Sequence, residues 1–183
     1  MHDGWLCYAP PSYAPIVGPL PFERNSYITF YSFSNPAKIN EDVLTVWVQI
    51  LAAAPHSKLL LHYANMDAIT VSSRLTKSFA AKDIDPECLE LKDRCPHPEL
   101  LADYNDVDIA LDPFPYSGGL MNYKAILMGA PVVTMHRNTF ASRHSTIHLM
   151  ALGATELIAT DESTYVQLAV NLVSDPDALA QMR

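Results

Sequence analysis

The chain has 183 residues, of which 49% are hydrophobic, and it carries a formal net charge of −8 at pH 7. This length and composition are typical of one globular domain with a sizeable core. The 12 lysines and arginines are scattered singly, which argues against a surface that binds nucleic acid or an anionic membrane. No apolar run is long enough to span a membrane and no signal-peptide pattern occurs, so we expect a cytoplasmic location.

The N-terminal segment is rich in proline. The stretch APPSYAPIVGPLPF at residues 9–22 contains five prolines. Proline lacks a backbone donor and restricts the residue before it, so this stretch predicts an extended tether or an arm that lies on another surface. We therefore expect a linker or arm over residues 1–25 and a compact domain over residues 26–183.

Strand and helix patterns alternate through the rest of the chain. β-branched and apolar runs predict strands at residues 27–33, 58–63, 88–91, 107–111, 131–135 and 156–159. Helices are predicted from the N-cap Asn40 through Leu51, and at residues 67–82, 98–104, 118–128, 139–151 and 161–173. Residues 175–183 start a further helix that looks cut by the end of the chain. This alternation predicts an α/β domain, a Rossmann-like parallel sheet with helices on both faces.

Ligands of such sheets lie beyond the carboxyl ends of the strands. That rule selects the loops after Phe33, Leu91, Leu111 and Met135. In the first of these loops, Lys38 could stabilise a phosphate as a point charge, and an ordinary surface lysine is the alternative.

The loop Ser117-Gly118-Gly119 precedes a predicted helix. Glycines allow a close backbone approach to an anion, and a helix N-terminus supplies free N–H groups with a partial positive charge. The alternative is a tight turn that needs a positive φ.

Other polar residues have simpler interpretations. His144 and His148 have the i, i+4 spacing of a metal pair, but no HExxH glutamate or third ligand is nearby, so a solvated or capping role is expected. Asp108 and Asp112 are expected to form turns through side-chain hydrogen bonds. The odd number of cysteines, without a C-x-x-C spacing, predicts reduced thiols rather than a disulfide framework or a zinc site.

Several segments together resemble the O-GlcNAc transferase family, in particular its bacterial members with tetratricopeptide repeats. These segments are FSNPAKIN at residues 33–40, DIALDPFPYSGG at 108–119, GAPVVT at 129–134, TFASRHS at 139–145 and ELIA at 156–159. They occur in the family's order at compatible spacing, and the similarity runs from about Gly4 to the C-terminus.

The resemblance implies the C-terminal, nucleotide-sugar-binding half of a GT-B glycosyltransferase. Such enzymes transfer N-acetylglucosamine or another hexose from a UDP-sugar to protein Ser, Thr or Asn, with inversion and without a required metal or cofactor. The protein acceptor would bind through an N-terminal half and repeats that this sequence lacks, so the chain alone should not catalyse transfer. The Pro-rich arm would connect the two halves.

The resemblance also implies roles for individual residues. Lys38 would be the catalytic lysine at the diphosphate, where it stabilises the charge that grows on the leaving UDP, with Asn35 beside it. The segment that includes Arg94, Cys95 and His97 would receive the uracil. The residues expected to hold the phosphates at the helix N-terminus are Ser117, Gly118, Gly119, Leu120 and Met121.

Five positions depart from the family pattern. Met121-Asn122 replaces Thr-Thr or Thr-Gly, and Lys124 replaces the acid that bonds the ribose hydroxyls, although a lysine cannot accept a hydrogen bond. Tyr31 and Arg137 stand where glycine is usual, and Tyr31 could fill sugar space. These changes leave open a second function, a catalytically degraded domain that serves as a binding or scaffold module. A third possibility is an α/β domain with unrelated chemistry.

Overall fold

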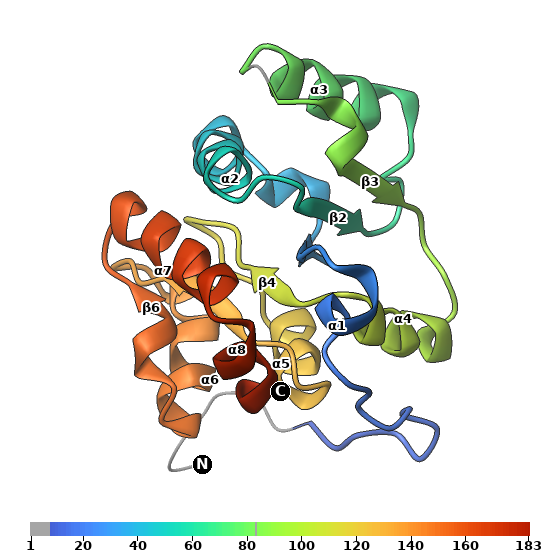
Figure 1. Ribbon diagram of the computed structural model, residues 1–183, viewed down its shortest axis with the longest axis vertical. Coiled ribbons are helices and arrows are strands. Elements are labelled where there is room, and N and C mark those ends of the chain that lie inside the picture. The colour runs from blue at the N-terminus through green and yellow to red at the C-terminus, as the bar shows by residue number, and fades with distance from the viewer. Residues whose placement is uncertain (1–7, 83) are drawn as a thin grey trace.

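A computed structural model describes residues 8–82 and 84–183 of the chain, so Cys7 lies outside the described residues. The model confirms the α/β fold with a sheet of six parallel strands (Figure 1). The strand order is β3-β2-β1-β4-β5-β6. The strands are β1 (Thr29–Ser32), β2 (Lys58–His62), β3 (Leu89–Lys92), β4 (Ile109–Leu111), β5 (Val132–Met135) and β6 (Ile158–Ala159).

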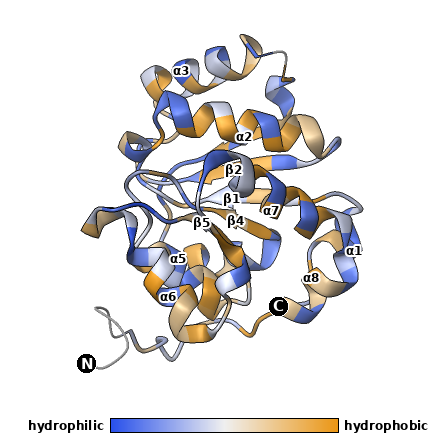
Figure 2. Cartoon of the chain, turned by 90° about the vertical axis from the view of Figure 1, so that its left-hand side faces the viewer, coloured by the Kyte–Doolittle hydropathy of each residue, from blue (hydrophilic) through white to orange (hydrophobic). Residues whose placement is uncertain are grey.

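Helices cover both faces of the sheet. One face carries α2 (Glu41–Ala53) and α7 (Glu162–Ser174), with α3 (Ile69–Ala80) beside α2. The other carries α4 (His97–Asp103), α5 (Leu120–Leu127) and α6 (His144–Leu152), while α1 (Phe22–Asn25) and α8 (Pro176–Met182) lie near the amino ends of the strands. Hydrophobic residues predominate in the central strands, and the outer helices alternate hydrophobic and hydrophilic residues (Figure 2). No helix within the described ranges is long and apolar enough to cross a membrane.

The sequence pattern of α2 shows why these elements form. The Asn40 side chain caps the helix by accepting a hydrogen bond from the Val43 N–H at 2.9 Å. The side chains of Val46, Trp47 and Ile50 recur at helical spacing and are buried against the sheet and α7. Burial of this apolar stripe is the main stabilisation of the helix.

Packed structure starts earlier than the expected boundary at residue 26. Leu20 is buried, and α1 follows it directly. The preceding arm lies on the turn after α4, where the Gly18 N–H donates to Asn105 Oδ1 at 2.8 Å and Asn105 Nδ2 donates to the Ile16 carbonyl at 3.0 Å. Proline nitrogens carry no hydrogen to donate. The arm is therefore held through the backbone of Gly18 and Ile16, with which the Asn105 side chain forms its hydrogen bonds.

Asp108 fastens this N-terminal region to the sheet. Its buried carboxylate accepts hydrogen bonds from the Phe22 N–H at 2.9 Å and the Thr29 N–H at 2.8 Å. The expected side-chain hydrogen bonds therefore form, but they join α1 and β1 to the start of β4 rather than closing a local turn.

We expect Asp108→Ala to lower the free energy of unfolding by about 2–3 kcal/mol, because two backbone donors would lose their buried acceptor. Urea denaturation followed by circular dichroism measures the change. Asp106→Ala is the matched control: Asp106 is exposed and pairs with Arg24, so its loss should cost less than about 1 kcal/mol. Equal effects of the two variants would contradict the anchoring role of Asp108.

Candidate functional site

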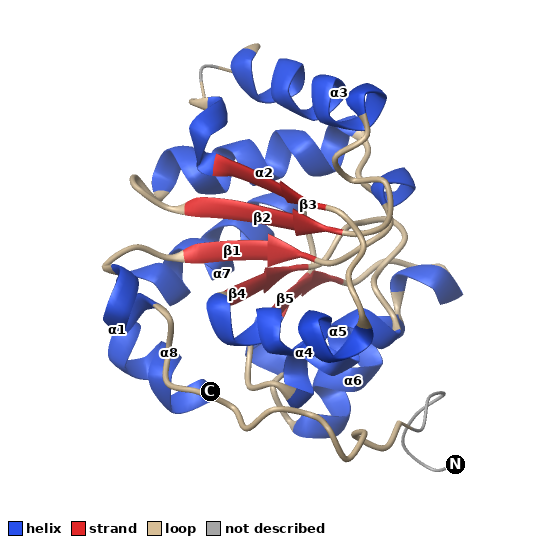
Figure 3. Ribbon diagram, turned by 90° about the vertical axis from the view of Figure 1, so that its right-hand side faces the viewer, coloured by secondary structure: helices blue, strands red, loops and turns tan. Residues whose placement is uncertain are grey.

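The candidate site lies at the point in the sheet where the order of consecutive strands reverses. From β1 the chain proceeds outward through β2 and β3, and it then returns to place β4 on the other side of β1. The loops after β1 and β4 therefore meet beyond the carboxyl ends of neighbouring strands (Figure 3). Parallel α/β sheets bind their ligands at such a switch point.

Lys38 joins these two loops. Its Nζ donates to the Ser117 carbonyl at 2.9 Å and lies 4.0 Å from the centre of the Tyr116 ring. Burial lowers the pKa of Lys38, and the nearby Asp112 opposes this shift. A half-buried cation that contacts a carbonyl and a ring favours an anion at this place. Asn35 is exposed beside it, and its side chain caps the turn by accepting from the Ala37 N–H at 2.9 Å.

Asp112 holds the glycine loop from beneath. Its carboxylate is 1% exposed and accepts hydrogen bonds from the Gly118 N–H at 2.5 Å, Asn122 Nδ2 at 2.5 Å and Thr134 Oγ1 at 2.6 Å. Burial raises the pKa of Asp112 to about 6, although these hydrogen bonds lower it. Ser145 closes the network, since its Oγ donates to the Gly118 carbonyl at 3.0 Å.

The close contact under Gly118 explains why glycine is required there. A Cβ atom on Gly118 would lie 2.6 Å from Asn122 Nδ2. The glycines with positive φ among the described residues are Gly129 and Gly153, so the alternative of a tight turn with positive φ is wrong for this loop. The loop uses glycine to bring its backbone close to a side chain from the next helix.

Helix α5 begins directly after this loop without a side-chain cap. Its N-cap residue is Gly119, which carries no acceptor, and Leu120 follows as the first helical residue. The N–H groups of a first helical turn need partners from outside the helix, and an anion can supply them. The structure thus places the expected phosphate-binding residues next to Lys38.

A pocket of about 730 Å³ opens beside this helix end. Its lining includes four residues of the expected site, Arg94, Cys95, His97 and Met121. Lys38 and Ser117 are not part of the lining. The first turn of α5 connects the two regions, because it starts at the glycine loop while Met121 reaches the pocket. The Tyr104 hydroxyl fixes this turn by donating to the Met121 carbonyl at 2.9 Å.

The sequence interpretation missed the part of the pocket that β2 contributes. His62, Tyr63 and Ala64 line it at the carboxyl end of that strand, together with Leu100 from α4. The loop after Tyr63 also follows the carboxyl end of a strand, so the rule for parallel sheets covers it as well.

Lys124 lies near the pocket without lining it. Its side chain is 5% exposed on α5, and burial lowers its pKa. Burial also lowers the pKa of His97 at the pocket, and the charge of Lys124 contributes to that shift. Lys124 therefore brings a positive charge toward the pocket, where a hydrogen-bond acceptor was expected from the resemblance.

The expectation that Tyr31 could fill sugar space is wrong. Tyr31 is 2% exposed and packs in the core, with its ring centre 4.8 Å from that of Phe33 and 5.6 Å from that of Tyr104. The side chain points to the α4 face of the sheet instead of its carboxyl edge, because it lies inside β1. Arg137 is half-buried and pairs with Glu162 at 3.7 Å.

His144 and His148 are also placed differently from the expected solvated or capping role. Both are buried, and their rings meet aromatic edges: His144 lies 5.0 Å from Phe140 and His148 lies 5.1 Å from Tyr123, measured between ring centres. Burial lowers both pKa values, and Lys38 contributes to the shift of His144. Neither histidine belongs to a cluster of three metal-ligating side chains in the described part of the chain.

The raised pKa of Asp112 gives a prediction with a definite sign. A carboxyl that binds its proton more tightly in the folded state stabilises the fold at low pH and loses this contribution as the pH rises from about 4 to about 6. The difference in unfolding free energy between the wild type and Asp112→Asn should fall by about 3 kcal/mol over this range. Urea denaturation at a series of pH values measures it.

Asp161→Asn is the control of opposite sign. Asp161 is an exposed N-cap whose pKa is lowered to about 2 by hydrogen bonds from Thr164 and Ser163. Its contribution is present above pH 4 and is lost as the pH falls further. A flat difference for Asp112→Asn, or the same sign for both variants, would contradict the assignment.

Comparisons with known proteins agree with this geometry. Residues 21–183 match the profile of Glycosyl transferase family 41. The chain is 36% identical over 183 residues to a protein of Petunia hybrida named "Probable UDP-N-acetylglucosamine--peptide N-acetylglucosaminyltransferase SPINDLY", with 99% of this chain and 20% of that protein covered. The corresponding SPINDLY protein of Arabidopsis thaliana is 35% identical over the same shares. The chain thus spans about a fifth of the length of these relatives.

Solved structures are also similar to this chain. An O-GlcNAc transferase mutant from Thermobaculum terrenum matches with a TM-score of 0.89 and 33% identity, over 95% of this chain and 32% of that one. Anabaena HepE, solved with UDP and glucose, shares the fold with a TM-score of 0.61 and 13% identity, over 85% of this chain and 41% of that one. By its profile, its sequence relatives and its fold, the chain belongs to Glycosyl transferase family 41.

Proposed function

We propose that this chain is the donor-binding domain of an inverting protein O-glycosyltransferase that uses UDP-N-acetylglucosamine. The observation that carries the proposal is the meeting of Lys38 with the glycine loop and the uncapped start of α5. A diphosphate placed there receives a cation and backbone donors together. The names of the plant relatives and of the Thermobaculum structure support the choice of donor.

The adjoining pocket would hold the uracil. Arg94, Cys95 and His97 line it, and main-chain groups of this loop can bond the edge of a base. Met121 belongs to both regions, because it lies in the first turn of α5 and lines the pocket. A nucleoside diphosphate has the same sequence of parts, a base joined through a sugar to two phosphates.

Lys38 would assist the departure of UDP. Negative charge grows on the diphosphate as the bond to the sugar breaks, so a fixed cation and aligned N–H groups stabilise the transition state more than the ground state. An anion would also replace the carbonyl as the partner of the half-buried ammonium. We propose that these groups do the work of a divalent metal, so that transfer needs no metal or other cofactor.

The protein acceptor would bind outside this chain. Because the chain spans about a fifth of its plant relatives, we propose that an N-terminal half and tetratricopeptide repeats complete the enzyme. The arm at residues 8–18 would lead to that half. The chain by itself should bind the donor without transferring the sugar.

A second candidate function is a binding module that no longer transfers sugar. Two side chains favour it: Met121 places an apolar group in the pocket, and Lys124 brings a buried cation where an acceptor for the ribose hydroxyls would be useful. In this case UDP would bind weakly or not at all.

Titration of UDP into the chain by calorimetry tests the proposed function. We expect micromolar binding, and Lys38→Ala should weaken it by at least about tenfold, since a charge-assisted contact to phosphate would be lost. Lys77→Ala, which removes an exposed lysine of α3, is the control and should leave the affinity unchanged. Absence of binding at millimolar UDP would exclude donor binding by this chain and favour the second candidate.

Lys124→Glu tests the ribose contact. A carboxylate at this position can accept hydrogen bonds from a diol, so we expect UDP to bind several-fold more tightly than to the wild type. Lys124→Met removes the charge with little change in size and adds no acceptor. An equal gain in both variants would assign the effect to the charge alone, and weaker binding by both would show that Lys124 itself contacts the ligand.

A further inference from the structure

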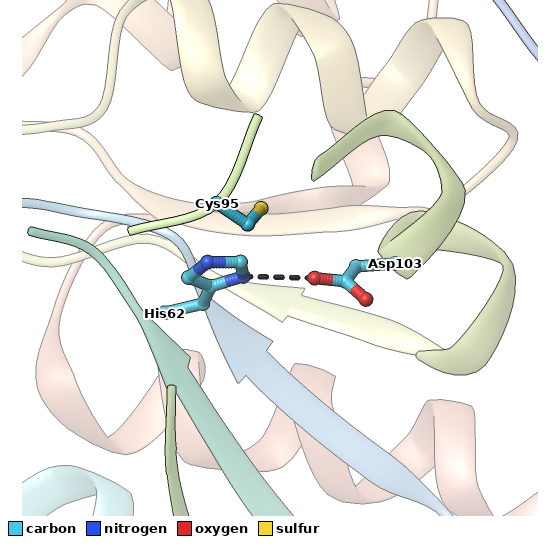
Figure 4. Close-up of side chains that lie close together, drawn as sticks. All are labelled: His62, Cys95 and Asp103. Carbon is cyan, nitrogen blue, oxygen red and sulfur yellow. Dashed lines mark ion pairs between the residues drawn. The ribbon is translucent and has the colours of Figure 1, made fainter. Parts of the chain in front are cut away.

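Three side chains with metal-ligating atoms converge beside the pocket, and the proposed transfer reaction uses none of these atoms. His62 ends β2, Cys95 lies in the loop after β3, and Asp103 ends α4. One ligand atom from each lies within 4.8 Å of the other two (Figure 4). Within the described ranges this is the one place where three such side chains come so close.

The spacing is close to that of a metal site. His62 Nδ1 lies 3.0 Å from Asp103 Oδ2. Bonds of zinc to nitrogen and oxygen are about 2.0–2.2 Å long, so two ligands of a tetrahedral ion lie about 3.4 Å apart. The histidine and aspartate therefore need only a small outward shift. Cys95 must move inward by more, and its position in a half-buried loop between β3 and α4 permits that movement.

The chemistry of the three atoms favours zinc over other divalent ions. An imidazole nitrogen, a thiolate sulfur and a carboxylate oxygen form a mixed set that suits a borderline-soft cation and does not suit magnesium or calcium. A bound thiolate and a carboxylate together balance the two positive charges of the ion. Three protein ligands leave a fourth position, which would face the pocket that His62 and Cys95 line.

The surrounding charges are compatible with this occupant. Lys92 Nζ lies 3.5 Å from Asp103 Oδ1, the oxygen that does not pair with His62, so both contacts can coexist. Lys92 also pairs with Glu90 at 3.9 Å, which reduces its repulsion of a cation. Burial raises the pKa of the Cys95 thiol, and a metal that binds the sulfur takes the place of its proton.

We propose that His62, Cys95 and Asp103 form a three-ligand zinc site whose open fourth position faces the pocket beside α5. The site has no part in the transfer reaction. Because the same pocket is proposed to receive the uracil of the donor, zinc and UDP should exclude each other. This last consequence rests on the proposed function, whereas the metal site does not.

Cobalt and zinc titrations test the site on the untagged chain. The background is Cys7→Ser with Cys88→Ser, so that Cys95 carries the only thiol. After treatment with a chelator, Co²⁺ should give the near-ultraviolet charge-transfer band of a cobalt–thiolate bond at one equivalent. Zn²⁺ should abolish that band, and calorimetry should show one zinc ion bound per chain.

Variants of the ligands define the expected loss. In the same background, Cys95→Ser should remove the band, and Asp103→Asn should weaken zinc binding by about tenfold or more. Asp106→Asn is the matched control and should leave zinc binding unchanged, because Asp106 is an exposed carboxylate near Asp103 that pairs with Arg24 and is not a ligand. No cobalt band in the background protein, or zinc binding that survives Cys95→Ser unchanged, would overturn the proposal.

A measurement without ligand variants guards against misfolding. Zinc should slow the alkylation of Cys95 by iodoacetamide in the wild-type chain, as followed by peptide mass spectrometry, while Cys88 reacts at an unchanged rate. Equal rates at Cys95 with and without zinc would contradict the site. UDP titration without metal reports on the proposed function separately, so failure of one proposal can be told from failure of the other.

Discussion

The site depends on one buried carboxylate. Asp112 lies at the end of β4, where the order of strand connection reverses, and it fixes the backbone of Gly118, the side chain of Asn122 on α5 and the hydroxyl of Thr134 on β5. These hydrogen bonds and the burial of Phe114 in the core together set the path of the loop between β4 and α5. The position of the α5 N-terminus, and with it the contact between Ser117 and Lys38, follows from that path.

The buried charge of Asp112 lowers the folding stability, while its hydrogen bonds hold the loop in one conformation. A carboxyl whose pKa rises to about 6 is more easily protonated in the folded protein than in solution, which means that its charge is unfavourable in the fold. Three donors reduce this penalty without removing it. Rigid backbone donors are useful at a site that binds an anion, because little further ordering is needed when the ligand arrives.

Much of the fold could be predicted from the sequence, because its patterns are local. The stripe of Val46, Trp47 and Ile50 and the cap at Asn40 define α2 without reference to the rest of the chain. The start of the packed region could not be predicted, since the backbone of Phe22 is held by Asp108, more than eighty residues away. Proline-rich sequence indicates an extended path and does not reveal which surface it follows.

The site itself was only partly predictable, for the same reason. The loops of Lys38 and Ser117 were identified because the strands before them are recognisable and the resemblance names them. To predict the position of Tyr31 one must know how side chains alternate within β1, because this alternation directs Tyr31 into the core. The convergence of His62, Cys95 and Asp103 has no signal in the spacing of the sequence, because it depends on how β2, β3 and α4 come together.

The arm that precedes the domain contacts His97, one of the residues that line the pocket. The Tyr13 hydroxyl lies 2.8 Å from His97 Nδ1, and Asn105 holds the backbone at Gly18 and Ile16. The surroundings of His97 at the pocket therefore depend in part on a side chain that lies more than eighty residues earlier in the chain.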